Sequence, residues 1–507
     1  MIFLKKKINP RRKQLRENIA AEKFARLSEF INTGIPLSFL ILLCFIAASS
    51  FILSILAGQD LFGFRPIHQI ISVIFISAGI GFAMAIYIYH YNNRIIKNHT
   101  RATALAGLFI ILLAVTRLGA FFPNRDYLAM ACAVTCAIIL VIAYDQRFAI
   151  GMSIIFAPLI CFAAGRETDF SLFLTMSAGI LTSCFFLKEI RTRIKLLEVG
   201  VFAGAAVFIV CFATSLYENK PSGSIFAFSG MMAAATIFVG VIIQALLPLI
   251  EKVFRIATSM TLLDYSDANQ PLLKKLAMEA PGTFSHSLLI GSIAEAAAES
   301  IGANGLLCRV GAYYHDIGKI GKPRYFVENQ MGTASRHDQL SPAMSQLIIV
   351  GHVKDGIEMA REYRLPAVIR QFIETHHGTT LIEYFYEEAK KKSNGKTAPP
   401  TEAEFRYPGP KPQTKEAAIV MLADAVEGTV RALTEVTPTK IETVVHNMAM
   451  KRLQDGQFDE CELTLRELNR TETSLAKSLA AHHHGRIAYP KPADKTELTD
   501  ENENQQV

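Results

Sequence analysis

Residues 311–323 read GAYYHDIGKIGKP and place His315 beside Asp316, just before a turn broken by glycine. A histidine next to an aspartate is common on protein surfaces, so the pair alone is weak evidence for a functional site. Imidazole and carboxylate are nevertheless ligand types that suit zinc, manganese and iron. The other residues of the sequence are needed to distinguish a surface pair from a metal centre.

Apolar residues are concentrated in the first half of the chain. The 507 residues are 51% hydrophobic with positive mean hydropathy, which is too apolar for an ordinary soluble protein. A bilayer core about 30 Å thick needs roughly 20 apolar residues per helix. We predict eight membrane spans, at 35–57, 68–91, 103–122, 128–144, 148–165, 169–187, 199–217 and 224–250.

One short turn decides the predicted topology. Only Asp145-Gln146-Arg147 separates the spans at 128–144 and 148–165. If these were one span, every later connection and the C-terminal half would be assigned to the opposite side of the membrane. Charge placement favours two spans, because Lys and Arg concentrate on the cytoplasmic side of membrane proteins. Nine of them lie within residues 1–34. Others lie in the connections after spans two and six: Arg94, Lys97, Arg101, Lys188, Arg191, Arg193 and Lys195.

We therefore predict a multi-pass protein of the bacterial cytoplasmic (inner) membrane with both termini in the cytoplasm. Residues 1–34 form a basic cytoplasmic N-terminus, and 35–250 form a transmembrane domain of an anchor helix plus seven helices. The first apolar run is too long, and its basic leader too extended, for a cleaved signal peptide. Few ionisable residues lie deep in a span, Arg117 and His90 being near span ends, which favours an anchor or sensor over a transporter.

The second half reads as an all-helical domain. A helical connector over 251–280 leads into a domain over 281–490, and residues 491–507 form a polar, disordered tail. Apolar residues recur at helical spacing in 284–301, 341–363, 366–377, 416–434 and 438–453. The Lys-, Pro- and Gly-rich stretch 389–415 is predicted to be an exposed loop. Basic residues mixed with aromatic residues, which nucleic-acid binding would need, are missing from this half, so we expect no nucleic acid polymer as a partner. The apolar first half makes the lipid bilayer an expected partner.

Five histidines and two aspartates lie within or next to these helical segments: His286, His315, Asp316, His352, His376, His377 and Asp424. A lone histidine on an apolar helix is more often structural than a ligand. Seven such residues are harder to dismiss, because ligands from different helices of a bundle converge in its core. Neither Cys308 nor Cys461 has CxxC spacing, so no zinc ribbon is indicated.

The adjacent pair suggests a chemistry. On a helix, His315 and Asp316 would point about 100° apart, so His315 could serve one ion while Asp316 bridges to a second. Two such ions activate water and stabilise an in-line displacement at phosphorus, which predicts hydrolysis of a phosphate ester. Lys319, one turn later, could meet phosphate charge as a flexible cation. Asp316 and Lys319 are therefore the predicted catalytic residues.

Several blocks of the sequence, in order, carry a specific resemblance. They are PGTFSHSLLIGSIAEAAAESIGAN, RVGAYYHDIGKIGKPRYFVENQ, HVKDGIEMA, IETHHGTTLIEYFY, DGQFDECELTLREL and HGRIAYP. Together they closely resemble the seven-transmembrane HD family of cyclic-di-AMP phosphodiesterases, part of the HD superfamily of metal-dependent phosphohydrolases. The resemblance covers about 200–490 strongly and the membrane half by topology.

The resemblance implies a fold, a reaction and a ligand set. It implies an HD phosphohydrolase domain that cuts cyclic di-AMP to linear pApA with two divalent metal ions, Mn or Fe. Asp316 would bridge the ions, His286 and Asp424 would complete the shell of one, and His352 and His376 that of the other. His377 matches the second member of the family's histidine pair, and its part as a direct ligand is left open.

Two rival functions follow from the same residues. A cyclic-di-GMP phosphodiesterase of the HD-GYP group would carry a GYP segment after its histidine pair, whereas this sequence continues HHGTTLIEYF. A membrane receptor with a nucleotide-binding, catalytically silent HD domain would have lost metal ligands, and all seven positions are kept. A homo-oligomer is left open.

One departure concerns the outer side of the membrane. Family members usually carry a large extracytoplasmic domain after the first span, whereas here a connection of about ten residues, 58–67, separates the first two spans. Sensing by a folded outer domain is therefore in doubt. Two further histidine motifs are expected to be structural: His337-Asp338 as a loop or cap before the helix near Pro342, and His482-His483-His484 as a polar helix end.

Overall fold

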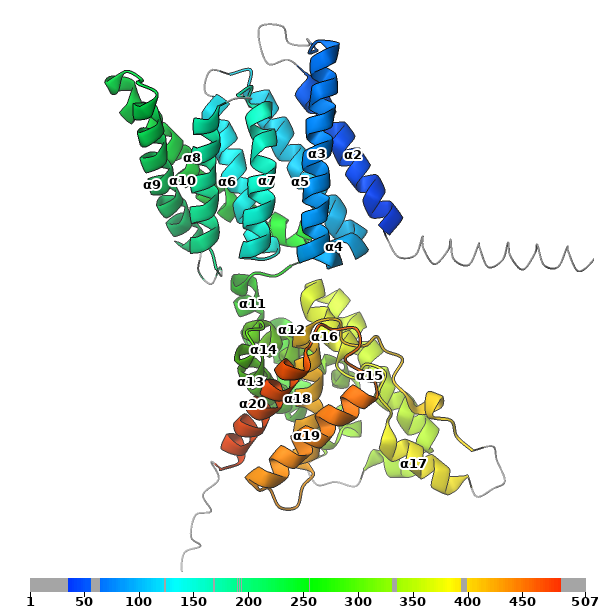
Figure 1. Ribbon diagram of the computed structural model, residues 1–507. Coiled ribbons are helices and arrows are strands. Elements are labelled where there is room, and N and C mark those ends of the chain that lie inside the picture. Colours follow the sequence, from blue (N-terminus) through cyan, green and yellow to red (C-terminus); the bar gives the residue numbers. More distant parts are fainter. Residues whose placement is uncertain are drawn as a thin grey trace, which may run out of the picture. The chain divides into compact units, whose positions relative to one another are not determined.

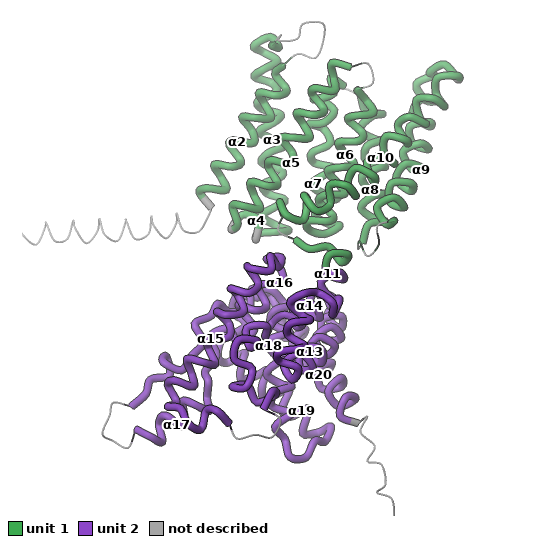
Figure 2. The backbone as a smooth tube through the Cα atoms, turned by 180° about the vertical axis from the view of Figure 1, so that it is seen from behind, with its two compact units in different colours: residues 1–261 green, residues 262–507 purple. Residues whose placement is uncertain are grey.

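A computed structural model describes residues 35–55, 64–122, 125–166, 169–188, 190, 192, 194–254, 256–330, 335–393 and 399–484. The chain divides into two compact units, Met1–Thr261 and Leu262–Val507 (Figure 2). Among the described residues there is no strand, only the isolated bridges Ile55↔Phe64 and Leu381↔Arg406. The all-α prediction is confirmed for this part of the chain, whereas the predicted basic N-terminus over 1–34 and tail over 491–507 lie outside it.

The first unit is a bundle of apolar helices (Figure 1). Its helices are α2 (Ile35–Ser54), α3 (Ile67–Tyr91), α4 (Asn93–Lys97), α5 (His99–Gly119), α6 (Arg125–Ala143), α7 (Gln146–Ala163), α8 (Phe170–Phe186), α9 (Ile194–Tyr217) and α10 (Ser222–Phe254). Seven of the described helices are long and apolar enough to cross a membrane: α2, α3, α5, α6, α7, α9 and α10.

The span predicted over 169–187 corresponds to α8, an apolar helix of 17 residues that is slightly shorter than the other apolar helices. The Asp169 side chain accepts a hydrogen bond from the backbone N–H of Leu172 at 2.9 Å and so caps the start of this helix. Asp145 caps α7 in the same way through the N–H of Phe148, at 2.8 Å. This second cap explains why α6 and α7 are separate helices, as predicted.

Arg117 is held inside the first unit at the end of α5. Its side chain is only 3% exposed, and its guanidinium donates to the carbonyl oxygens of Ala163, at 3.1 Å, and of Ile55. Ala163 is the last residue of α7, so these acceptors are carbonyl groups that a helix end leaves unpaired. Arg117 therefore closes off backbone groups that would otherwise be unsatisfied in an apolar surrounding.

The second unit is a helical domain built around α18 (Lys415–Arg431), whose residues 417–423 are all buried. Around it lie α13 (Pro281–Ser300), α14 (Gly305–Tyr314), α16 (Ala367–Thr375), α19 (Pro438–Gln454) and α20 (Leu465–His484). The unit also contains α12 (Pro271–Glu279), α15 (Pro342–Glu362), α17 (Glu383–Lys392) and the 3₁₀ turns η1 (Ile317–Gly321), η2 (Pro323–Tyr325), η3 (Val327–Asn329), η4 (Arg336–Gln339) and η5 (Glu402–Phe405).

Local sequence signals explain several helix starts in this unit. Ser341, Thr414 and Thr437 each accept a backbone N–H at the first turn of the following helix. Proline occupies the first helical position of α12, α13, α15 and α19, where its missing N–H costs nothing. Within the predicted connector over 251–280 lie the end of α10, α11 (Ser259–Tyr265) and α12.

Two boundaries in the second unit differ from the prediction. The stretch 389–415 is not simply an exposed loop, because α17 continues to Lys392 and the side chains of Phe405 and Tyr407 are buried. The helix expected over 366–377 ends at Thr375, so His376 and His377 follow it. Gly378 has a positive φ of 52°, a backbone conformation that stops a right-handed helix.

Candidate metal centre

The seven candidate ligands come together in the second unit. His286 lies on α13, His352 on α15 and Asp424 on α18, while the other four follow helix ends: His315 and Asp316 after α14, and His376 and His377 after α16. Their ligand atoms form two groups, each within 4.8 Å. One group comprises His286, His315, Asp316 and Asp424, and the other comprises Asp316, His352, His376 and His377.

Asp316 belongs to both groups because its two carboxylate oxygens face different histidines. Oδ2 lies 3.1 Å from His315 Nε2 and 3.9 Å from His286 Nε2. Oδ1 lies 3.3 Å from His352 Nε2 and 3.5 Å from His376 Nε2. The sequence analysis assumed that His315 and Asp316 lie within one helix. In the structure they lie at the junction of α14 and η1. This junction sets how the carboxylate is turned between the two groups.

The histidine rings are oriented by hydrogen bonds at their outer nitrogens. The Nδ1–H of His315 donates to the carbonyl of Ala312 at 2.6 Å, and that of His352 to the carbonyl of Ile349 at 2.5 Å. Nδ1 of His376 donates to the carbonyls of Phe372 and Ile373, one turn back along α16. A carbonyl can only accept, so each Nδ1 carries a proton and each Nε2 is turned toward the centre of the site. Histidine ligands of metals usually have their outer nitrogen bonded to a carbonyl or carboxylate in this way, which fixes the orientation of the ring.

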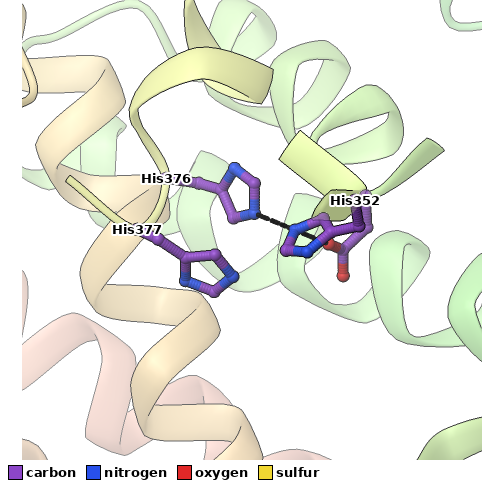
Figure 3. Close-up of side chains that lie close together, drawn as sticks. His352, His376 and His377 are labelled. Carbon is purple, nitrogen blue, oxygen red and sulfur yellow. Dashed lines mark hydrogen bonds and ion pairs between the residues drawn. The ribbon is translucent and has the colours of Figure 1, made fainter. Parts of the chain in front are cut away.

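Figure 3 shows the rings of His352, His376 and His377 grouped together, with a dashed line from His352 to His376. Their Nε2 atoms are 3.1 Å apart. The ring of His377 stacks on Tyr407 with centroids 4.2 Å apart, and its side chain is 23% exposed, against 2% or less for the other two. The Asp424 side chain is 15% exposed, so His377 and Asp424 mark the open side of the site.

Burial and charge shift the pKa values of histidines in the two groups in opposite directions. Burial lowers the pKa of His352 to about 3 and holds the pKa of His377 well below its usual range. Burial also opposes the charged form of His315, but the Asp316 carboxylate outweighs it and raises the pKa of His315 to about 10. For Asp316, burial is likewise outweighed by His315 and Lys319, which keep its pKa well below the usual value.

Buried polar atoms at the centre of the site fit a bound cation. Among the described residues, His315 Nε2 and Asp316 Oδ1 are buried with no hydrogen-bond partner. Leaving such atoms unsatisfied costs about 1–3 kcal/mol each. Imidazole nitrogen and carboxylate oxygen are ligands of first-row transition metals, so a cation between these atoms would remove the deficit.

Lys319 lies in the site, but as the partner of two carboxylates. Its Nζ is 2.7 Å from Asp316 Oδ2 and 2.8 Å from Glu328 Oε1, and it lies 4.9 Å from the ring centroid of Phe326. Burial opposes the charge of Lys319, but these carboxylates outweigh burial and raise its pKa above the usual value. The lysine therefore stays protonated and offsets the negative charge of Asp316. Direct contact with a substrate phosphate, as the sequence analysis expected, stays a prediction.

Two supporting residues were missed by the sequence analysis. Glu427, one turn after Asp424 on α18, places Oε2 2.7 Å from Nδ1 of His286 and so supports the one buried ligand ring that lacks a carbonyl partner. Gln457, in the block DGQFDE, is fully buried; its amide oxygen accepts from the N–H of Thr379 at 2.9 Å and its amide group donates to the Thr379 hydroxyl at 2.8 Å. Spacing on α18 could have indicated Glu427, whereas Gln457 is joined to the His376-His377 turn only by the fold.

The other histidine motifs lie outside both ligand groups of the described residues. His337 and Asp338 are in η4, directly before α15, and Nε2 of His337 lies 2.9 Å from the carbonyl oxygen of Tyr325. His482, His483 and His484 are the last residues of α20. Both motifs are where the sequence analysis expected structural roles.

This chain combines a bundle of membrane-length helices with an all-helical unit that carries a shared His/Asp centre. These features are typical of HD-domain membrane proteins. Residues 67–258 match the family model described as "7TM receptor with intracellular HD hydrolase", and residues 283–429 match the model of the HD domain. The two matches lie in the order in which a seven-transmembrane HD protein carries these parts. Helix α2 precedes the first match.

Two relatives carry the name cyclic-di-AMP phosphodiesterase PgpH. The protein from Bacillus subtilis is 37% identical over 450 residues, which are 85% of this chain and 61% of the relative. The protein from Listeria monocytogenes is 38% identical over 402 residues, 76% of this chain and 53% of the relative. This chain thus spans between half and two thirds of the length of these relatives.

Solved structures of the L. monocytogenes PgpH HD domain are also similar to this chain. One is 47% identical and is covered completely by 43% of this chain, with a TM-score of 0.41. A second, in complex with cyclic di-AMP, has the same identity and coverage and a TM-score of 0.40.

Proposed function

We propose that the protein is a membrane-bound phosphodiesterase that hydrolyses cyclic di-AMP to linear pApA. The observation that carries the proposal is the carboxylate of Asp316, whose two oxygens face separate groups of histidine nitrogens. A shared carboxylate between two ligand groups suits a two-metal site for displacement at phosphorus. The names of the B. subtilis and L. monocytogenes relatives support cyclic di-AMP as the substrate.

The residues would hold two divalent ions, manganese or iron. His286, His315, Asp316 and Asp424 would hold one ion, and Asp316, His352 and His376 the other, with His377 at the open side of the second group. When bound, such ions lower the pKa of water and stabilise charge on phosphoryl oxygens. The chain itself orients the ligand rings through Nδ1 and Glu427, and Lys319 offsets the charge of Asp316.

The membrane half would hold this site at the inner face of the cytoplasmic membrane. The Lys and Arg residues before α2, between α3 and α5 and between α8 and α9 support cytoplasmic termini by the positive-inside rule. The lipid bilayer is then a permanent partner of the protein.

A second cation, Arg452 near the end of α19, would contact the substrate. Its Nε is buried without a hydrogen-bond partner, and it forms no ion pair among the described residues. Burial lowers the pKa of Arg452, and the charges that oppose this effect are on Asp424, Asp455, Glu383 and Tyr407, the last of which stacks on His377. A cyclic dinucleotide has two phosphodiester groups, and only one can lie at the metal centre. We propose that the planar guanidinium of Arg452 binds the other phosphate.

Replacing Arg452 by glutamine should therefore weaken substrate binding more than turnover. We expect KM for cyclic di-AMP to rise about 10-fold or more, because a hydrogen bond to a charged group contributes about 1.5–3 kcal/mol, while kcat changes little. The matched control is Lys451→Gln, which removes the same charge from the neighbouring exposed residue, paired with Glu383. An unchanged KM in Arg452→Gln would remove this residue from the substrate site.

The function is tested with the full chain purified in mild detergent. The protein is stripped of metal with a chelator, reloaded with Mn²⁺, Fe²⁺ or Mg²⁺, and incubated with cyclic di-AMP or cyclic di-GMP, with products separated by chromatography. We expect linear pApA from cyclic di-AMP with Mn²⁺ or Fe²⁺ and no product from the stripped protein. Faster cleavage of cyclic di-GMP would favour the HD-GYP-like alternative, and tight binding of cyclic di-AMP without cleavage would favour the receptor.

A further inference from the structure

A cavity of about 220 Å³ lies in the first unit where α2 packs against α3, α4 and α5. Its walls are apolar apart from Ser38, and they include Phe45, Ile96, Ala106 and Phe109. The hydroxyl of Ser38 donates to the carbonyl of Ile96 at 2.6 Å, so this polar group is already satisfied. A cavity without free polar groups does not hold water well and suits an apolar occupant.

The residues at the α3–α4 end of the cavity indicate its depth in the membrane. Ile88, near the end of α3, and Ile95 and Ile96 of α4 line this end. In the same last turn of α3, the side chains of Tyr89 and Tyr91 are 67% and 55% exposed. Tyrosine is enriched at the boundary between lipid tails and headgroups. The cavity therefore extends from the headgroup boundary toward the hydrocarbon interior, where Phe45 and Phe109 line it.

The sequence around this end is positively charged. Arg94 and Lys97 belong to α4, and Arg101 lies in the first turn of α5. No Asp or Glu occurs between Asp60 and Asp126. Basic segments at the membrane surface attract anionic lipid headgroups, and basic pockets between membrane helices bind them.

We propose that this cavity binds one acyl chain of an anionic phospholipid, with its phosphate group at the basic segment 94–101. The apolar walls select a hydrocarbon chain, and the charges of the segment select a negative headgroup over a zwitterionic one. One wall of the site is α2, which lies outside the region 67–258 matched by the seven-helix family model. The proposal concerns the membrane unit and does not depend on the proposed catalytic function.

The test uses the full chain in detergent and native mass spectrometry. Phosphatidylglycerol and phosphatidylcholine of equal chain length are added separately, and retained lipid is counted per chain. We expect one tightly retained phosphatidylglycerol and weaker retention of phosphatidylcholine. Ala106→Phe, which fills the cavity, should abolish this retention. Ile111→Phe, on the 62% exposed part of the same helix, is the matched control and should retain the lipid.

A second variant leaves the cavity walls unchanged. Arg94→Gln/Lys97→Gln/Arg101→Gln should still hold a lipid but lose the preference for phosphatidylglycerol, by about fivefold for each charge removed. Lys188→Gln/Arg191→Gln/Arg193→Gln removes three charges from another connection and should keep the preference. Equal retention of both lipids by the wild type, or undiminished retention by a folded Ala106→Phe protein, would overturn the proposal.

Discussion

Asp316→Ala is expected to empty both ligand groups of metal and to lower cyclic di-AMP turnover at least about 10³-fold, the scale of losing a main electrostatic element of an active site. The reason is geometric, because Asp316 supplies one oxygen to each group, at 3.1 Å from His315 and 3.3 Å from His352. Its removal also leaves Lys319 with only Glu328 as a partner. Metal content per chain, by elemental analysis, and pApA formation are the two measurements.

Variants of single ligands distinguish the loss of one ion from the loss of both. His286→Ala should lower the metal content by one ion per chain through the first group, and His352→Ala by one ion through the second, whereas Asp316→Ala affects both. The matched control is Asp338→Ala, which removes the exposed carboxylate of the other His-Asp pair and should keep full metal content and activity. If Asp316→Ala still binds two ions per chain, Asp316 does not bridge them.

Gly318→Ala is expected to be the most damaging small substitution near the site. A Cβ at this position would lie 1.8 Å from the carbonyl oxygen of His352 and 2.5 Å from the backbone N of Gly356. Both atoms belong to the backbone of α15, so neither can turn aside as a side-chain tip would. Turn η1 and α15 must then separate, which draws Asp316 away from His352. Overpacking of this kind costs about 1–3 kcal/mol or more.

The expected result is a lower midpoint of thermal unfolding together with loss of metal from the second group. Gly321→Ala, three residues later in the same turn, is the matched control because an added Cβ meets nothing within 4 Å. Comparing the two variants separates close packing from a general effect of replacing glycine. A Gly318→Ala protein that melts with the control and binds full metal would contradict the contact between η1 and α15.

Much of the membrane unit could be predicted from the sequence, because the length of an apolar run and a capping aspartate are local properties. Asp145 marked the break between α6 and α7. The same kind of cap, at Asp169, marks the start of α8. In the second unit, the Lys-, Pro- and Gly-rich composition of 389–415 suggested exposure, but packing of Tyr407 against His377 buries part of it.

The identities of the candidate ligands were also readable from the sequence, although their roles as ligands stay a prediction. Histidine and aspartate in or near apolar helices stand out by residue type, and the ordered blocks relate them to a known family. Supporting residues do not stand out in this way. Glu427 and Gln457 are ordinary polar residues until the fold brings them to His286 and to Thr379.

By itself, the sequence determined the helical class, the apolar helices of the membrane unit, the family that the chain resembles and the set of residues with metal-binding chemistry. These follow from hydrophobic length, caps and residue type, which act over a few positions. Only the tertiary structure decided how these residues are used: which Asp316 oxygen faces which histidines, that Lys319 is paired, and that Gly318 has no room for a side chain. His286 and Asp424 are 138 positions apart, and a contact at such separation depends on how whole helices pack, which no local pattern records.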